Sequence, residues 1–119
     1  MAKKTKSSKI SKLSAVDQDI LTVMNCGREF YGLELLHILN CDRSTLVGCE
    51  LSYGSIYPSL NRLIDKKLIT WRWGDESEDS NGARRKYYQM TQLGKERLNA
   101  LKQYRNNLLN NITLNLASA

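Results

Sequence analysis

The amino-acid sequence predicts an α+β fold that is mostly helical, with one small antiparallel hairpin between helices. Apolar residues recur at helical spacing in three segments that precede residue 67. Two short segments rich in β-branched and aromatic residues follow, at 68–73 and 84–90. A last helical pattern starts after Thr91 and runs to near Asn111. A chain of 119 residues has room for one compact unit with appendages, so we expect these elements to form a single fold.

The first two helices are predicted by apolar periodicity and, for the first, by a start signal. Ser14 lies three residues before Asp17, the spacing of an N-cap side chain followed by an acid in the first turn. We therefore expect the first helix near 14–26. Closely spaced leucines after Gly32 predict a second helix that ends near Asn40. The polar segment that follows has no period and is expected to be a connection.

The third helix is predicted around a proline. Its buried face is formed by apolar residues at helical spacing: Ile56, Leu60, Leu63 and Ile64. The opposite face carries a polar set: Ser55, Pro58, Ser59, Asn61, Arg62 and Lys66, with Asp65 among them. A proline inside a helix removes one backbone hydrogen bond and clashes with the preceding turn. Either the helix begins near Gly54 with Pro58 in its first turn, or it begins at Ser52 and kinks.

Two strands, at 68–73 and 84–90, are predicted to pair as an antiparallel hairpin. The long loop between them carries four acids: Asp75, Glu76, Glu78 and Asp79. Side chains alternate along a strand, so Arg85 should face away from its neighbours Arg84 and Lys86.

The last helix is predicted to be capped by Thr91 and to carry a long apolar stripe. A small three-helix core cannot bury the whole stripe, so apolar surface is left over. We expect this surface to join two copies of the chain, with the segment 91–114 as a dimerisation helix. The residues assigned to the dimer interface are Leu98, Leu101, Tyr104, Leu108 and Ile112.

The distribution of charge favours a polyanionic partner. The chain has 18 lysines and arginines against 12 acids, a formal net charge of +6, which is typical of proteins that bind nucleic acid or an anionic membrane surface. Residues 1–12 contain five lysines and no acid, so we expect a disordered basic tail. Lys9 and Lys12 of this tail either lie along phosphates or have no partner. No apolar run is long enough to cross a bilayer and no signal peptide is visible, so we expect a cytoplasmic protein that does not associate with membranes.

Catalytic and metal-dependent functions are not expected. His37 is the only histidine and lies in a leucine-rich helix, where a packed imidazole is far commoner than a catalytic one. The odd number of cysteines without a C-x-x-C pair (Cys26, Cys41 and Cys49) is typical of reduced thiols, not of a disulfide framework or a zinc site. No nucleophile elbow, phosphate-binding glycine loop or zinc-protease motif is present. We therefore expect no enzyme activity, no metal and no cofactor.

The order of the elements is that of a winged helix-turn-helix, a three-helix core plus a two-stranded wing, whose third helix enters the major groove of DNA. We assign residues 13–90 to this DNA-binding domain. The candidates on the third helix are Ser55, Tyr57, Ser59, Asn61, Arg62 and Lys66. Their polar groups can bond to base edges or phosphates. The alternative is that they form a solvated face.

On the wing, Arg84, Arg85 and Lys86 are the candidates for contacts to backbone phosphates, and a solvated charge run is the alternative. The acidic loop repels phosphates over about 8 to 10 Å, the Debye length at moderate salt. We therefore expect the bases of the wing strands to touch DNA while the tip stays away. Trp71 and Trp73 share one face of their strand, either as hydrophobic cover or as part of a pocket for an aromatic ligand.

Several motifs together resemble the PadR family of bacterial transcriptional regulators. They are Tyr31-Gly32, the run from Gly54 to Leu63, Leu68-Ile69 and the run from Arg84 to Thr91, in this order and spacing. The resemblance covers about residues 14–112. It implies a homodimer built through the C-terminal helix and repression by occupancy of a palindromic promoter site in double-stranded DNA. It also implies release by a small effector in many members.

The sequence departs from the family pattern at two places. A single helix after the wing resembles the short subgroup, part of which binds flat aromatic drugs against a tryptophan of the last helix. This helix has Tyr104 and no tryptophan, so a small aromatic effector is retained only as a candidate partner. Lys67 stands where the family often has glycine, so either it adopts the conformation that ends a helix or the turn differs. A second function class, a protein-interaction adaptor that modulates another regulator through the same scaffold, is the alternative.

Overall fold

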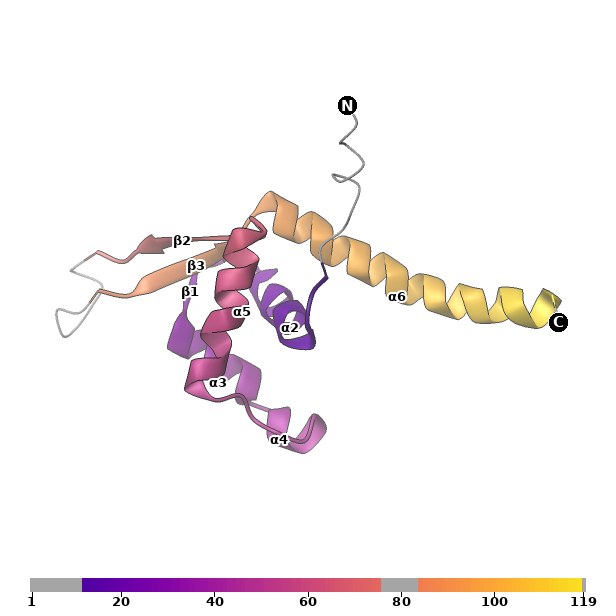
Figure 1. Ribbon diagram of the computed structural model, residues 1–119, viewed down its shortest axis with the longest axis horizontal. Helices are drawn as coiled ribbons and strands as arrows, with labels where there is room; N and C mark the ends of the chain where they lie inside the picture. Colours follow the sequence, from indigo (N-terminus) through magenta and orange to yellow (C-terminus); the bar gives the residue numbers. More distant parts are fainter. Residues whose placement is uncertain (1–11, 76–83, 119) are drawn as a thin grey trace, which may run out of the picture.

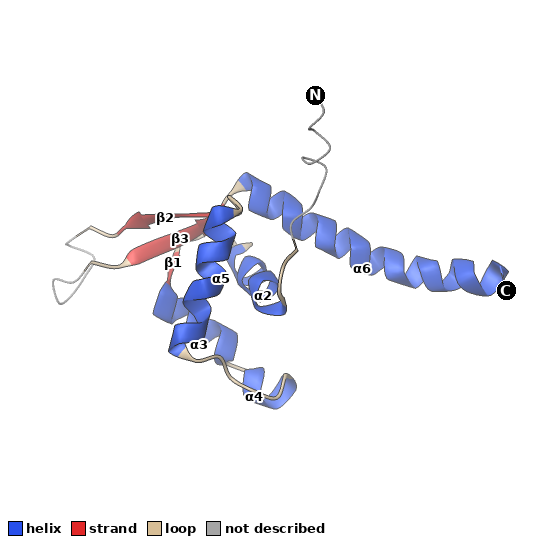
Figure 2. Cartoon of the chain, viewed as in Figure 1, coloured by secondary structure: helices blue, strands red, loops and turns tan. Residues whose placement is uncertain are grey.

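The computed structural model describes residues 12–75 and 84–118 and has the predicted mostly helical α+β architecture (Figures 1 and 2). The basic tail lies outside the described residues except for Lys12. In chain order the elements are α2 (Ala15–Met24), β1 (Phe30–Tyr31), α3 (Gly32–Asn40), α4 (Arg43–Leu46), α5 (Tyr53–Asp65), β2 (Ile69–Trp73), β3 (Lys86–Met90) and α6 (Gln92–Ser118). The wing and α6 leave the helical body in opposite directions (Figure 1). No helix of the described part is long and apolar enough to cross a membrane.

The predicted start signal of the first helix is confirmed as a complete capping box. The Asp17 backbone N–H donates to Ser14 Oγ at 3.1 Å, and the Ser14 N–H donates to Asp17 Oδ2 at 3.1 Å. Two orphan backbone donors of the helix start are thereby satisfied. The helix ends at Met24, two residues earlier than expected, since the chain turns at Gly27 with φ +91°.

The connection after α3 contains a four-residue helix that the sequence did not predict. Arg43, the first residue of α4, is 9% exposed, and its Nη1 donates to the Cys49 carbonyl at 3.2 Å. Asn40 binds the end of the connection at Leu51. Its side-chain amide donates to the Leu51 carbonyl at 3.0 Å and accepts from the Leu51 N–H at 2.9 Å. Side-chain bonds to the backbone thus shape a segment that has no apolar period.

The sheet has three strands in the order β1-β3-β2, all antiparallel. The predicted hairpin is confirmed, with Ile69 opposite Met90 and Trp73 opposite Lys86. The two-residue strand β1 was not predicted, because two residues are too short to show alternation. It pairs Phe30 with Tyr88 and so joins the wing to the start of α3.

The third helix, α5, begins at Tyr53, so Pro58 lies beyond the first turn. The expectation of a late start with Pro58 in the first turn is therefore wrong. A proline here leaves the carbonyl of Gly54, four residues earlier, without its helical donor. Both residues are exposed, so water can replace that bond. This exposure explains why the helix continues through the proline.

The core is formed where α2, α3 and α5 meet the sheet and the first turns of α6. Its buried apolar residues are Ile20, Leu21, Met24, Phe30, Leu35, Ile56, Leu60, Leu63, Leu68, Ile69, Tyr88 and Leu98. Leu98 is 1% exposed within the single chain. Its assignment to the dimer interface is therefore wrong, because it packs against the core of its own protomer.

A tight joint links the end of α5, the start of β2 and the start of α6. Lys67 has φ +64°, and the bonds Lys67 N to Ile64 O and Leu68 N to Leu63 O, both 2.9 Å, form a Schellman motif. Lys67 therefore takes the helix-ending conformation, the first of the two alternatives. The Thr91 hydroxyl donates to the Lys67 carbonyl at 2.8 Å and accepts from the Gly94 N–H at 3.0 Å, which confirms the predicted cap of α6.

Candidate nucleic-acid interface

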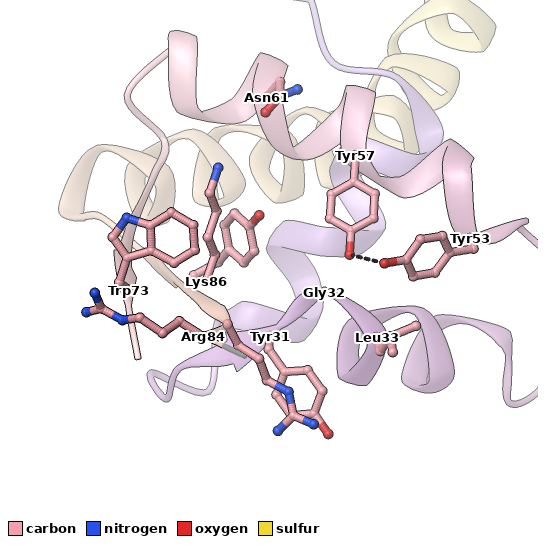
Figure 3. A pocket seen from close by; sticks show the side chains of 11 residues that line it. Tyr31, Gly32, Leu33, Tyr53, Tyr57, Asn61, Trp73, Arg84 and Lys86 are labelled. Atoms are coloured by element: carbon pink, nitrogen blue, oxygen red, sulfur yellow. Dashed lines mark hydrogen bonds between the residues drawn. The ribbon is translucent and has the colours of Figure 1, made fainter. Parts of the chain in front are cut away.

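The exposed face of α5 presents fewer of the predicted residues than expected. Ser55 and Asn61 are exposed. The Ser55 hydroxyl donates to the Ser52 carbonyl at 2.8 Å, where it helps to close the first turn. Asn61 lies farther along the same helix, on the wall of a groove that α5 forms with the wing (Figure 3). Of the predicted set, Asn61 is thus the clearest candidate for a contact to a base.

Ser59 and Arg62 occupy different positions from those the sequence predicted. Ser59 is 2% exposed, so its placement on the free face is wrong. It lies three residues after Ile56 and four before Leu63, both buried, and this spacing puts it at the edge of the buried face. Arg62 bends back over it, with Nη2 donating to Ser59 Oγ at 2.9 Å.

Arg62 joins α5 to the start of α2. Its Nη2 and Nε donate to the two carboxylate oxygens of Asp17 at 3.0 and 3.4 Å. The Asp17 side chain is 1% exposed, whereas that of Arg62 is 46% exposed. Burial by itself would raise the pKa of Asp17, but hydrogen bonds from Arg62, Ser14 and Ser59 outweigh it and lower the pKa. The Asp17 carboxylate therefore carries a charge that Arg62 neutralises.

The lysine candidates lie at the other end of α5. Lys66 is half-buried, and its ammonium group donates to the backbone carbonyl of Lys12. Lys12 itself is exposed, and Lys9 lies outside the described residues. Lys66 therefore links the beginning of the described chain to the end of α5.

Tyr57 lies half-buried between α5 and the start of α3. Its ring covers Gly32 so closely that a side chain there would meet Tyr57 Cζ at 3.0 Å and the hydroxyl closer still. Burial, together with the neighbouring Tyr53, raises the pKa of the Tyr57 phenol, so this hydroxyl keeps its proton. The Tyr31-Gly32 motif thus provides the space into which Tyr57 packs.

Each of the three predicted wing cations, Arg84, Arg85 and Lys86, lies near an aromatic ring. The Arg85 guanidinium lies 4.4 Å from the centre of the Tyr31 ring. Lys86 Nζ lies 4.4 Å from the centre of the Trp71 ring and 5.5 Å from the centre of the Trp73 ring. Arg84 reaches Trp73 as well, at 5.9 Å, and its Nε donates to the Gly74 carbonyl at 3.1 Å. Arg85 thus faces away from its two neighbours, as alternation predicts.

The two tryptophans share a face of β2, as predicted, with ring centres 5.5 Å apart and the rings nearly perpendicular. They are 37% and 47% exposed, so they only partly cover the core, and they serve as platforms for Lys86. Of the acidic loop, the structure describes Asp75, which is exposed. The expectation for the loop tip concerns residues outside the described ranges.

A groove of about 520 Å³ lies between α5, the start of α3 and the wing (Figure 3). Predicted residues from two separate motifs meet here: Tyr57, Asn61, Arg84, Arg85 and Lys86. The sequence analysis missed Tyr53, which contributes to the same wall. Its position four residues before Tyr57 on one helix face was the available signal.

The part of the chain that the structure describes contains no group of three or more histidine, cysteine, aspartate or glutamate side chains that could hold a metal ion. The thiols of Cys26, Cys41 and Cys49 are exposed and unpaired with one another. His37 is exposed on α3, away from this groove.

Comparison with known proteins agrees with the architecture. Residues 20–100 match the model of the transcriptional regulator PadR-like family. A PadR-like transcriptional regulator from Bacillus cereus is 34% identical, with 87% of this chain and 92% of that chain covered and a TM-score of 0.61. A PadR family regulator from Clostridium difficile is 27% identical, with 87% and 99% covered and a TM-score of 0.63.

A third structure contains nucleic acid. Bacillus subtilis PadR in complex with operator DNA is 23% identical, with 74% of this chain and 46% of that chain covered and a TM-score of 0.63. No curated protein matches the chain. The family model covers most of the sequence, and the Bacillus cereus regulator is more than 30% identical over 87% of this chain. The chain therefore belongs to the PadR-like family of transcriptional regulators.

Proposed function

We propose that this regulator binds a specific site in double-stranded DNA as a homodimer and represses transcription from a palindromic promoter site. The observation that carries the proposal is the meeting of the exposed α5 face with three wing cations around one groove. A protein of the same fold, Bacillus subtilis PadR, has been captured with operator DNA. Asn61 and Ser55 are assigned to base edges in the major groove, and Arg84, Arg85 and Lys86 to backbone phosphates.

Arg62 has a different role in this proposal from a base-reading one. Because its guanidinium is bonded to Asp17 and Ser59, it holds α5 at a fixed angle to α2. Lys66 and Lys12 meet at the end of α5 and are assigned to add positive charge near the phosphates. Contacts to base edges are thus assigned to Ser55 and Asn61, whereas Arg62 holds the helix that carries them.

The homodimer is assigned to the outer part of α6. Tyr104, Leu108 and Ile112 are 58%, 42% and 56% exposed, and Leu101 is half-buried. An apolar stripe of this length favours a second copy, because a paired helix would bury it. Two copies related by a two-fold axis would present two copies of α5, which requires a palindromic site. A small aromatic effector that alters this pairing remains part of the proposal.

Binding to DNA is tested with the purified protein by selection from genomic fragments, followed by fluorescence anisotropy at several salt concentrations. We expect a palindrome to be recovered, with affinity that falls steeply as salt rises. Arg84→Ala should weaken all duplexes to a similar degree and flatten the salt dependence, since it removes a phosphate contact. Asn61→Ala should reduce the preference for the palindrome over random duplex.

Repression is tested by in vitro transcription from a promoter that contains the recovered palindrome. Addition of the protein should lower the yield of transcript, and unrelated promoters should be unaffected. If the protein shows no salt-sensitive duplex binding and instead forms a complex with another regulator, the adaptor function replaces this proposal.

A further inference from the structure

The face of the sheet that is turned away from Trp71 and Trp73 carries a row of charged and aromatic side chains. Successive residues of a strand point to opposite faces, so Arg72, which lies between the two tryptophans, is on this face. The register places Arg72 opposite Tyr87, and Tyr87 opposite Tyr31 of β1. Directly opposite residues of antiparallel strands share a face, so these three side chains form one row across the three strands (Figure 1).

An ion pair at one end of this row joins the wing to the body. Arg72 Nε and Nη2 donate to the two carboxylate oxygens of Glu29, both at 2.7 Å, and Nη1 donates to the Trp73 carbonyl at 3.1 Å. Glu29 lies in the turn between α2 and β1, and Gln89 Nε2 of β3 donates to the Gly27 carbonyl of the same turn at 3.1 Å. Two parallel bonds fix the relative orientation of the two groups, which a single bond does not. The turn before β1 is thus attached to this face of the wing.

The row continues from Arg72 to Arg85 through two aromatic rings. The Arg72 guanidinium lies 5.1 Å from the centre of the Tyr87 ring. The Tyr87 and Tyr31 rings meet edge to face, with centres 5.9 Å apart and an angle of 73° between their planes. Tyr31 is in turn one of the partners of Arg85, whose guanidinium lies 4.4 Å from the centre of the Tyr31 ring. These are distances of attractive cation–π and aromatic contacts, so an unbroken series of contacts joins Glu29 to Arg85.

We propose that Glu29 is a positioning residue for DNA binding, which acts through Arg72 and the two tyrosine rings on the orientation of Arg85. The DNA part rests on the proposed function, in which Arg85 contacts a backbone phosphate, whereas the series of contacts does not. A side chain that is ordered before binding loses less conformational entropy when the complex forms. The Glu29 carboxylate repels phosphates, so it contributes to binding without touching the DNA.

Two simpler roles for Glu29 predict different results. The side chains of Glu29 and Arg72 are 32% and 42% exposed, and ion pairs with this much contact to water contribute little to the stability of a fold. A purely structural surface pair would therefore leave DNA binding unchanged. A carboxylate that acts only through its charge weakens the attraction of the wing to phosphates, so its removal would strengthen binding. Of the three roles, positioning alone predicts that removal of this negative charge weakens binding.

The first arm of the test measures duplex binding by Glu29→Gln, which keeps the size of the side chain and removes one negative charge. Fluorescence anisotropy with the selected duplex should show a loss of about three- to tenfold in affinity, the usual cost of ordering one long side chain. Urea denaturation should show a stability close to that of the wild type. Glu96→Gln is the matched control, because Glu96 is exposed on α6 and the substitution makes the same change of charge. The affinity of this control should not fall below that of the wild type.

A double-mutant cycle tests the coupling to Arg85. In an Arg85→Ala background, Glu29→Gln should cause no further loss of affinity, because the side chain that Glu29 positions is absent. Arg72→Lys keeps the positive charge but lacks the planar fork, so it should weaken binding about as much as Glu29→Gln does. Fully additive losses for Glu29→Gln and Arg85→Ala, or an Arg72→Lys variant that binds as the wild type does, would overturn the proposal.

The second arm uses the protein without DNA. An aromatic ring shields protons above its face, so the NMR signal of Arg85 Hε reports the contact with Tyr31. We expect this signal to move toward that of a free arginine in Glu29→Gln and to stay in place in Glu96→Gln. An unmoved signal, or a duplex affinity that Glu29→Gln leaves equal or raises, overturns the positioning role and leaves the proposed function intact. A moved signal in a protein that binds no duplex supports the series of contacts but overturns the proposed function, and with it the DNA part of the proposal.

Discussion

At the scale of single residues, the Asp17 carboxylate holds together two helices that are distant in sequence. One oxygen accepts the Ser14 N–H that begins α2, and both accept the guanidinium of Arg62 from α5. A buried carboxylate needs such partners, since an unpaired charge in the interior is costly. The sequence identified the helix cap but not the ion pair, because the two partners are separated by 45 residues and no local pattern joins them.

Arg62→Ala should destabilise the fold more than an exposed arginine normally would. The variant leaves the buried Asp17 without its cation, and we expect a loss of about 1 to 2 kcal/mol in the free energy of unfolding, since the guanidinium is still partly in contact with water. Urea denaturation measures it, with Lys102→Ala as the exposed control. An unchanged stability combined with a changed DNA sequence preference would return Arg62 to the base-reading role.

Acidification should remove the stability that Asp17 contributes. Its pKa is lowered in the folded protein, so the contribution is complete above about pH 4, the pKa of an unfolded aspartate. It is then lost as the pH falls through the lower folded pKa. Urea denaturation between pH 2.5 and 6 should show this decline in the wild type and a shallower one in Arg62→Ala. Parallel pH profiles for the two proteins would contradict the assignment.

At the scale of elements, sequence patterns predicted every element long enough to show a period. The helices α2, α3, α5 and α6 and the hairpin follow from spacing and caps. The short elements β1 and α4 do not, because pairing with β3 and the bond from Arg43 to Cys49 determine them. The geometry of the site could not be predicted for a similar reason. Arg84 and Tyr57 belong to separate motifs, and spacing within a motif does not show that they line one groove.

Lys67→Gly should stabilise the joint between α5 and β2. A residue with a Cβ atom at φ +64° carries a cost of about 1 to 2 kcal/mol that glycine avoids, offset in part by the greater freedom of glycine in the unfolded chain. We expect a net gain of about 0.5 to 1 kcal/mol by thermal or urea denaturation. Lys67→Ala removes the same charge but keeps Cβ, so it should not reproduce the gain.

At the scale of the whole molecule, α6 has two parts with different environments. Its first turns pack on the core through Leu98, whereas the segment beyond Leu101 has exposed apolar side chains. The helix reaches Ser118, farther than the predicted stripe, so Leu114 and Leu116 extend the exposed apolar surface. The sequence showed the stripe but not the point where it leaves the core, because that point depends on the size of the core.

Two substitutions on α6 should separate folding from association. Leu98→Ala removes a buried side chain and should lower the free energy of unfolding by about 2 to 5 kcal/mol. Leu108→Asp alters an exposed residue, so a protomer should keep its fold and its helical content while the dimer dissociates. Analytical ultracentrifugation and circular dichroism measure the two effects. A Leu108→Asp variant that sediments as the wild type does would contradict the proposed seam.

The joint at Lys67, Thr91 and Gly94 and the buried Leu98 fix the first turns of α6 against the body that carries α5. The segment beyond Leu101 is about 25 Å long at 1.5 Å per residue, so a bend of about 10° at Leu101 moves its far end by about 4 Å. That displacement is about one base-pair step of 3.4 Å. In a dimer, small changes of angle at this point would set which operator spacing the two copies of α5 can span.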